Sequence, residues 1–306
     1  MLKTNIYNTI INPCIYNASG CLCTSSDELD NLLNSKAGAI LTKSSTLEQR
    51  IGNPEPRLKI NNFGSINSMG IPNYGLEYYN NYYDNNKNLL NKPFIQSIYP
   101  YSISEMENMI NAINNKNIEL NLSCPNLNKM IITYDYNNLE KYLDKLKIIK
   151  TDNNFSLKLP PYYHNYEFDN ISNLLLKYDV IDNIVCINSI CNGLLVDIET
   201  ETTLIKPNYG LGGIGGNYIL PTALANVNNF YKRLDNKINI IGCGGITSGQ
   251  DIFKHILCGA KAVQVGTTFY KEGIACFERL EKELIDIMNK KNYNNIEQFR
   301  GNLKFL

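Results

Sequence analysis

The segment ELNLSCPN, residues 119–126, begins with alternating polar and apolar residues and ends in Ser123, Cys124, Pro125 and Asn126. Such alternation is typical of a half-buried β-strand, and the polar tail marks the point at which that strand ends. Cys124 therefore stands at a strand end together with two carboxamides, those of Asn121 and Asn126. We expect this thiol to be the chemical centre of the protein.

Eight short apolar runs bounded by turn residues predict strands. They cover residues 14–17, 38–43, 93–99, 118–122, 155–159, 184–188, 238–242 and 262–266. Amphipathic stretches between them, several with Ser, Thr or Asp near the start, predict helices. These cover residues 26–34, 102–114, 139–149, 168–178, 222–234, 248–257 and 274–288. Regular alternation of strand and helix over 306 residues predicts an α/β fold with a single (β/α)₈ TIM barrel.

Two long segments interrupt this alternation. Residues 44–92 follow the second predicted strand, and residues 189–221 follow the sixth. Loops after barrel strands lie on the C-terminal face, where active sites are built. Neither a linker nor an internal repeat divides the chain, so we expect residues 1–306 to form one domain.

Composition excludes several classes of protein. Hydrophobic residues make up 43% of the chain, charged residues 19%, and the formal net charge is +0, so the sequence offers no electrostatic basis for binding nucleic acid. The N-terminus lacks a secretory pattern and no window reaches the length of a membrane helix, which predicts a cytoplasmic protein with no membrane partner. An odd count of nine cysteines argues against a disulfide framework.

A metal site is not expected. The chain contains no CxxC pair, and its two histidines, His164 and His255, are far apart in sequence. We interpret both histidines as surface or packing residues. Seven of the cysteines are interpreted as small buried apolar side chains, namely Cys14, Cys21, Cys23, Cys186, Cys191, Cys258 and Cys276.

Polar residues at the ends of the apolar runs are the candidates for a site. They are Lys43, Asn121, Cys124, Lys158, Asn188 and Ser189. Any one of them alone would be interpreted as a capping or turn residue, but strand ends in a barrel open into a common mouth. We therefore expect these six side chains to converge.

Glycines in the last third of the chain indicate a phosphate site. Gly244 and Gly245 follow the seventh run, Gly266 and Thr267 follow the eighth, and a third glycine-rich segment covers residues 212–216. A single glycine cluster is more often a tight turn, but barrels commonly bind phosphate with loop amides after these two strands. A phosphorylated cofactor, two lysines and a thiol beside carboxamides indicate redox chemistry on a small planar ring.

Ten motifs, in order, resemble one family. They are NPCIYNASG, TKSST, RIGNPEPR, GSINSMGIPN, NLSCPN, SLKLPP, CINSI, GGIGG, IIGCGGI and QVGT, and they extend over almost the whole chain. The chain is similar to the soluble class 1A dihydroorotate dehydrogenases. This resemblance implies a (β/α)₈ barrel that binds FMN and oxidises (S)-dihydroorotate to orotate in pyrimidine biosynthesis. Electrons would pass to fumarate, giving succinate, and the protein would be a homodimer.

The resemblance also assigns roles to individual residues. Cys124 corresponds to the base that removes a proton from the carbon beside the one that loses hydride, and Lys158 would favour the reduced flavin. The substrate residues would be Lys43, Asn67, Met69, Gly70, Ile71, Asn121, Asn126, Asn188 and Ser189. The FMN residues would be Ala18, Ser19, Gly20, Lys43, Ser44, Asn121, Lys158, Ile187, Gly215, Gly216, Cys243, Gly244, Gly245, Gly266 and Thr267.

One departure and three alternatives remain. The segment after Cys124, PNLNKMIITYD, lacks the Gly of the family's lid loop and is shorter, so lid motion is expected to differ. The alternatives are a class 1B subunit that passes electrons through an iron–sulfur flavoprotein to NAD, a reductase acting on dihydrouracil, and a flavin-binding barrel without turnover.

Overall fold

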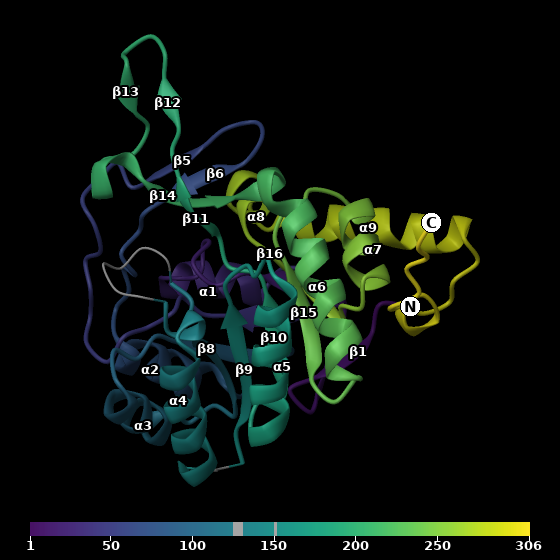
Figure 1. Ribbon diagram of the computed structural model, residues 1–306, viewed down its shortest axis with the longest axis horizontal. Coiled ribbons are helices and arrows are strands. Elements are labelled where there is room, and N and C mark those ends of the chain that lie inside the picture. Colours follow the sequence, from purple (N-terminus) through teal and green to yellow (C-terminus); the bar gives the residue numbers. More distant parts are fainter. Residues whose placement is uncertain (125–130, 150–151) are drawn as a thin grey trace.

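The computed structural model describes residues 1–124, 131–149 and 152–306. Its main sheet has eight strands whose hydrogen-bonded neighbours are all parallel, in the order β3-β16-β15-β10-β9-β8-β7-β4 (Figure 1). Along the chain these are β3 (Ile15–Asn17), β4 (Ile40–Leu41), β7 (Phe94–Ile98), β8 (Asn117–Asn121), β9 (Asn154–Leu159), β10 (Asn183–Cys186), β15 (Asn239–Cys243) and β16 (Ala262–Val265). Each coincides with one of the eight predicted runs, and the α/β barrel is confirmed.

The side chain of Asn17 joins the two ends of this strand order. Its Nδ2 donates to the carbonyl of Leu41 at 2.7 Å, and its Oδ1 accepts from the amide of Leu41 at 2.9 Å. Asn17 ends β3 and Leu41 ends β4, and Asn17 is fully buried. The Asn17 carboxamide and a 2.8 Å backbone hydrogen bond from the Gly38 amide to the Ile15 carbonyl thus join β3 to the β4 segment, and the sheet closes into a barrel.

Seven helices match the predicted amphipathic stretches: α1 (Ser26–Leu33), α3 (Ile103–Ala112), α4 (Tyr136–Ile149), α5 (Asn165–Tyr178), α6 (Leu220–Leu234), α7 (Gly249–Leu257) and α9 (Ala275–Lys290). Side chains accept from the first-turn amides at several starts, as Ser25, Ser102 and Ser248 do. On α4 the buried residues Leu139, Leu143 and Leu146 form an apolar stripe at helical spacing. These helices surround the barrel (Figure 1).

Two helices fall outside the predicted set. The helix α2 (Leu76–Asn86) occupies part of the Tyr- and Asn-rich segment that the sequence pattern left inside a long loop, and the ring of Tyr79 on it is fully buried. The short helix α8 (Thr267–Glu272) follows β16. Single 3₁₀ turns complete the helical elements at η1 (Ile132–Tyr134), η2 (Pro207–Gly210), η3 (Gly216–Ile219) and η4 (Ile296–Gln298).

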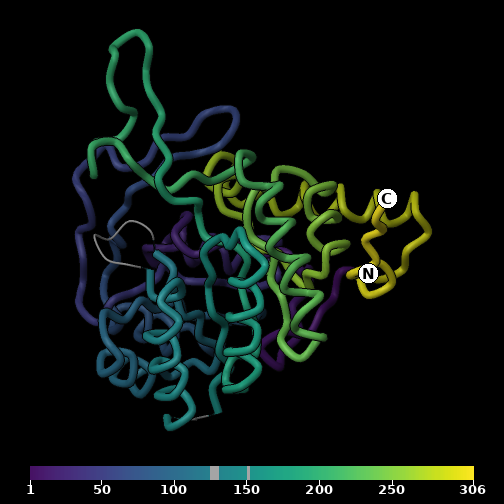
Figure 2. The backbone as a smooth tube through the Cα atoms, in the orientation of Figure 1, coloured from purple at the N-terminus to yellow at the C-terminus, as the bar shows by residue number. Residues whose placement is uncertain are grey.

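The two long loops after strands combine into a second sheet over the C-terminal face of the barrel (Figures 1 and 2). Its antiparallel order is β11-β14-β6-β5, built from β5 (Leu58–Ile60), β6 (Ser65–Asn67), β11 (Ile190–Gly193) and β14 (Gly212–Gly215). We call this sheet the roof. A hairpin of β12 (Val196–Asp197) and β13 (Thr202–Thr203) projects beyond it.

A hairpin of β1 (Thr4–Ile6) and β2 (Thr9–Ile11) precedes the first barrel strand. Tyr7 in its turn is 1% exposed, and its hydroxyl makes a 2.6 Å hydrogen bond with the hydroxyl of Ser156 on β9. The hairpin therefore inserts a side chain into the barrel core. Within the described ranges, the helices are all too short or too polar to cross a membrane.

Candidate active site

A cavity at the carboxyl ends of the barrel strands, beneath the roof, brings together nearly all the predicted site residues. The predicted residues that line it are Ala18, Ser19, Gly20, Lys43, Ser44, Asn67, Met69, Ile71, Asn121, Cys124, Lys158, Ile187, Asn188, Ser189, Gly215, Gly216, Cys243, Gly244, Gly245, Gly266 and Thr267. Gly70 is not among the lining residues, although both its neighbours are. Asn126 lies outside the described residues.

Four polar side chains at one wall of the cavity form a connected network. Asn121 Nδ2 donates to Ser44 Oγ at 3.0 Å, and Ser123 Oγ donates to Asn121 Oδ1 at 3.3 Å. Asn188 Nδ2 lies 3.1 Å from Ser123 Oγ and 3.2 Å from the Ser123 carbonyl. These bonds fix the carboxamides of Asn121 and Asn188 next to Cys124, which follows β8 and is partly exposed to the cavity.

Two phenols lie near Cys124. Burial raises the pKa of both Tyr99 and Tyr101, and proximity to Cys124 adds to the increase in each. The guanidinium of Arg50 lies 5.3 Å from the ring centre of Tyr101 and opposes the shift there. Because these hydroxyls keep their protons, neither Tyr99 nor Tyr101 can serve as a base at neutral pH.

Lys158 points into the cavity from β9 and is 6% exposed. Its Nζ donates to Gln264 Oε1 at 2.8 Å, and Gln264 Nε2 donates to Glu119 Oε2 at 2.6 Å. Burial lowers the pKa of Lys158, but the neighbouring Cys243 and Glu119 outweigh burial, so the pKa lies above its ordinary value. Burial raises the pKa of Glu119 despite Lys158 and Gln264. An ammonium therefore persists in the cavity wall.

Residues missed by the sequence interpretation also line the cavity. They are Cys21, Leu58, Ile60, Ser65, Glu119, Ile219, Ile246, Gln264 and Tyr270. The position of Glu119 in the sequence could have predicted its place in the site, because it precedes Asn121 by two residues and lies on the same face of the strand. Leu58, Ile60 and Ser65 come from the roof strands, which the periodicity of the sequence did not predict.

Five glycines contribute to the lining of the cavity, and we call them the glycine wall: Gly215, Gly216, Gly244, Gly245 and Gly266. Gly216, Gly244 and Gly245 have φ values of +71°, +123° and +77°, which favour glycine. A Cβ atom at Gly245 would collide with Leu220. These glycines and Thr267 line the cavity, and backbone amides of glycine-rich loops are groups that commonly bind an anion such as a phosphate.

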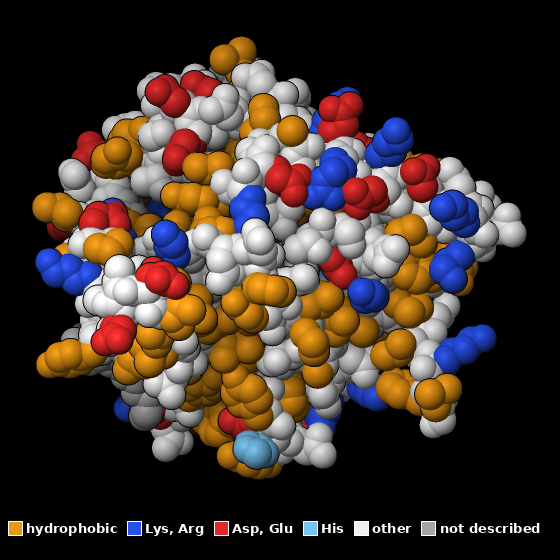
Figure 3. Space-filling model, turned by 90° about the horizontal axis from the view of Figure 1, so that it is seen from above, with side chains coloured by type: hydrophobic (Ala, Val, Ile, Leu, Met, Phe, Trp, Pro, Cys, Tyr) orange, Lys and Arg blue, Asp and Glu red, His pale blue; other side chains and the backbone are white. Residues whose placement is uncertain are grey.

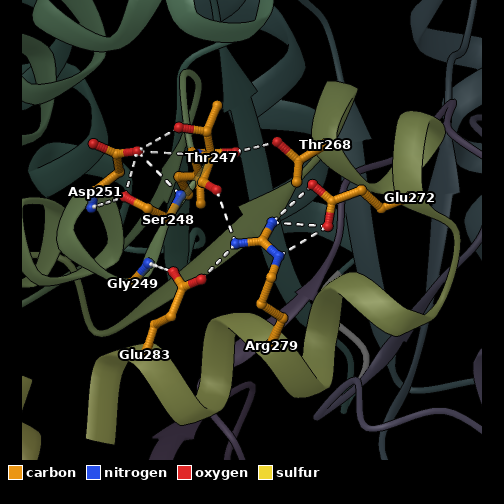
Figure 4. A network of polar contacts seen from close by, with 9 residues as sticks. Thr247, Ser248, Gly249, Asp251, Thr268, Glu272, Arg279 and Glu283 are labelled. Atoms are coloured by element: carbon orange, nitrogen blue, oxygen red, sulfur yellow. Dashed lines mark hydrogen bonds and ion pairs between the residues drawn. The ribbon is translucent and has the colours of Figure 1, made fainter. Parts of the chain in front are cut away.

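A polar network joins the loop after β15 to α8 and α9 (Figure 4). Arg279 on α9 donates to the carbonyl of Thr247 at 3.2 Å and pairs with Glu272 and Glu283, each at 2.8 Å. Glu283 in turn accepts from the amide of Gly249 at 2.7 Å. The loop after β15 is thus held against α8 and α9.

The two histidines differ in environment. His255 on α7 is fully buried, and its Nε2 lies 3.0 Å from the carbonyl of Gly244, while burial lowers its pKa to about 4. This neutral ring packs behind the glycine wall. His164 is exposed at the start of α5 and stacks on Tyr166. Both positions agree with the prediction of packing and surface roles.

The cysteine predictions are mostly confirmed. Cys14, Cys23, Cys186, Cys258 and Cys276 are buried, as expected for small apolar side chains. The prediction is wrong for Cys191, which is exposed on the roof strand β11. It is incomplete for Cys21, which is partly buried and lines the cavity.

Comparisons with known proteins agree with this geometry. The family model described as dihydroorotate dehydrogenase matches residues 1–288. The chain is 47% identical over 315 residues to the dihydroorotate dehydrogenase (fumarate) of Lachancea kluyveri, covering 100% of this chain and 99% of that protein. It is 48% identical over 304 residues to the Saccharomyces cerevisiae protein of the same name, covering 97% and 96%. The chain is also 46% identical over 313 residues to the dihydroorotate dehydrogenase A (fumarate) of Lactococcus lactis, covering 100% of this chain and 100% of that protein.

Solved structures support the fold. The ligand-free DHODH of Eimeria tenella superposes with a TM-score of 0.82 at 19% sequence identity, covering 98% of this chain and 91% of that one. The same protein in complex with ferulenol gives a TM-score of 0.79 at 19% identity, covering 98% and 88%. At this level of identity the likeness concerns the fold alone.

Acidification should weaken the fold through His255. The folded-state pKa of about 4 lies below the ordinary value of about 6.5, so protons bind preferentially to the unfolded chain and the stabilisation present above pH 6.5 is lost as the pH falls toward 4. Between pH 7 and 4.5 the His255 contribution should fall by about 2 to 3 kcal/mol. We expect His255→Gln to lose less unfolding free energy than the parent over this range in urea titrations. His164→Gln is the matched control and should follow the parent; equal losses in all three proteins would contradict the prediction.

Proposed function

Because this chain belongs to the dihydroorotate dehydrogenase family, we propose that it oxidises (S)-dihydroorotate to orotate in de novo pyrimidine biosynthesis, with fumarate as the electron acceptor. The observation that carries this proposal is the cavity in which Cys124, Lys158 and the carboxamides face one another. The fumarate-named relatives covered over nearly their whole length support the choice of acceptor. We propose that residues 1–306 act as one catalytic unit.

The family depends on flavin, and FMN is the flavin that we propose for this cavity. The glycine wall suits the phosphate, because a residue without a side chain lets a bound group approach the backbone closely. The ammonium of Lys158 suits the ring, since it would favour the negative charge that reduction places there. When bound, FMN supplies the hydride acceptor of the reaction.

Other side chains of the same cavity match the substrate. Lys43, which is 8% exposed, offers an ammonium for the dihydroorotate carboxylate. Asn67, Asn121 and Asn188 offer carboxamides, which can both donate to and accept from the amide edges of the ring without adding charge. Asn67 comes from the roof, so substrate would be held between the barrel and the roof.

Cys124 is proposed as the general base. A thiolate at this position would take the proton from the substrate carbon next to the one that loses hydride. The thiol must give up its own proton first, and its ordinary pKa of about 8.5 is close enough to neutrality for nearby cationic groups to make this feasible.

A steady-state assay of the purified protein tests this function. We expect rapid oxidation of dihydroorotate with fumarate and little with NAD or a quinone. Turnover that requires an added partner subunit and NAD would support the class 1B alternative, and preference for dihydrouracil would support a related reductase. A yellow protein without turnover on either substrate would indicate a non-catalytic flavin barrel.

Replacing Cys124 should separate binding from chemistry. Cys124→Ala is expected to retain flavin, seen in its visible spectrum, while turnover falls by about 10²- to 10⁴-fold, the usual contribution of a general base. Cys124→Ser should need a higher pH, since a hydroxyl is a far weaker acid than a thiol. Cys258→Ala removes a buried thiol at the end of α7 and serves as the control with parental turnover. A Cys124→Ala variant as fast as the parent would defeat the assignment.

A homodimer is the proposed assembly. The projecting hairpin carries exposed apolar side chains, with Leu194 49%, Val196 57% and Ile198 84% exposed. Figure 3 views the molecule from above and shows hydrophobic side chains spread among charged ones over this end. Burial of the hairpin residues against a second copy would remove them from water.

The cytoplasmic location expected from the sequence stays a prediction.

Light scattering after size exclusion tests the assembly. The parent should have twice the chain mass of 34.7 kDa, and the double variant Val196→Asp with Ile198→Asp should approach the single mass, because buried carboxylates oppose association. Ile148→Asp replaces a 76% exposed side chain on α4 and should leave the dimer intact. A double variant that keeps the parental mass would exclude the hairpin as the interface.

A further inference from the structure

Three polar side chains meet inside the barrel, each from a different strand. Glu119 lies on β8, Lys158 on β9 and Gln264 on β16, and their exposed fractions are 0%, 6% and 0%. Gln264 bridges the other two, with Oε1 at 2.8 Å from Lys158 Nζ and Nε2 at 2.6 Å from Glu119 Oε2. An ammonium in the cavity wall is thus connected to a carboxyl group deeper in the core.

The Lys158 ammonium determines which groups donate and which accept in the hydrogen bonds that link Lys158, Gln264 and Glu119. An ammonium can only donate, so Gln264 must turn its carbonyl oxygen to Lys158 and its NH₂ group to Glu119. The same NH₂ group lies 3.3 Å from the hydroxyl oxygen of Tyr16. Both Glu119 Oε2 and the Tyr16 oxygen must therefore accept, and Glu119 carries no proton on that oxygen.

Glu119 differs in charge from the other ionisable residues that line the cavity. Among the described residues that line the cavity, Lys43 and Lys158 are the cations and Glu119 is the one carboxyl group. A buried ammonium is costly without a counter-charge, and Glu119 is placed to provide it through one intervening amide. Glu119 Oε1 has no hydrogen-bond partner within the described part of the chain, and the Lys158 ammonium is the charge that favours the ionised form of Glu119 against burial by lowering its pKa.

We propose that Glu119, acting through Gln264, positions the Lys158 ammonium and lowers the reduction potential of the flavin in this cavity. The inference rests on the proposed function, because it requires that flavin. Lys158 favours the negative charge of the reduced ring, and the carboxylate of Glu119 opposes part of that effect. A lower potential makes the reduced cofactor a better donor to the acceptor. Glu119 and Gln264 are positioning residues, since their effect passes through Lys158.

The isosteric variant Glu119→Gln tests this inference in the flavin-loaded protein. The measurement is the reduction potential, obtained by equilibrating the flavin absorbance against a reference dye. We expect the ratio of reduced to oxidised flavin at a fixed potential to rise about tenfold, which corresponds to a shift of about +30 mV for a two-electron couple. Ser156→Ala is the matched control, because Ser156 pairs with Glu119 across β8 and β9 and its loss removes a buried hydroxyl without removing charge. Its potential should equal that of the parent.

The outcomes distinguish this inference from the proposed function. A parent protein that lacks flavin or does not oxidise dihydroorotate would overturn the proposed function. A normal parent together with an unchanged or lower potential in Glu119→Gln would overturn this inference alone. If Glu119→Gln does not fold, Glu119→Asp moves the charge away from Gln264 by one methylene. It should raise the potential by a smaller amount, and an unchanged value there would equally overturn the inference.

Discussion

The barrel depends on its closure between β3 and β4, where the Asn17 carboxamide makes two hydrogen bonds with the backbone of Leu41 and the Gly38 amide donates to the Ile15 carbonyl. The residues immediately after Asn17 and Leu41 reach the cavity, with Ser19 Oγ 2.9 Å from the carbonyl of Thr42 and 3.0 Å from Ser44 Oγ. The same closure therefore sets the spacing of two adjacent cavity segments. A buried carboxamide suits this position because it supplies a donor and an acceptor at one point, as a peptide group does.

Sequence patterns predicted the barrel because its elements are periodic over short ranges. Buried parallel strands appear as apolar runs, and the capped helices between them have apolar stripes. The helix α2 has no distinct apolar stripe in its sequence, because the tyrosines of LEYYNNYYDNN lie on several of its faces. Among these tyrosines, Tyr79 and Tyr82 are buried. The roof was not predicted because its strands have three or four residues and pair with partners distant in sequence. Local periodicity cannot indicate such pairing.

The site was predictable where chemistry coincides with a strand end. Parallel strands bring Lys43, Asn121 and Asn188 to one edge, and their sequence positions alone indicate that they meet. Glu119 and Gln264 lie within strands, where an isolated polar residue is easily taken for an irregularity of an apolar run. Their roles depend on contacts between β8, β9 and β16, which are set by barrel topology. Family resemblance supplied the remaining assignments, including Gly70, which is not a lining residue.

The roof has a consequence for the order in which the molecule is completed. Its ladder pairs Asn67 with Gly213, and Asn67 Nδ2 donates to the Gly213 carbonyl across 146 positions of sequence. During synthesis from the N-terminus, the first loop must wait for most of the chain before it gains this partner. Contacts of such separation form late, because the intervening loop entropy must be overcome first. The roof thus cannot form before Gly213 has been synthesised, and a chain that ends before this residue lacks the barrel strands β15 and β16 as well as the cover of the cavity.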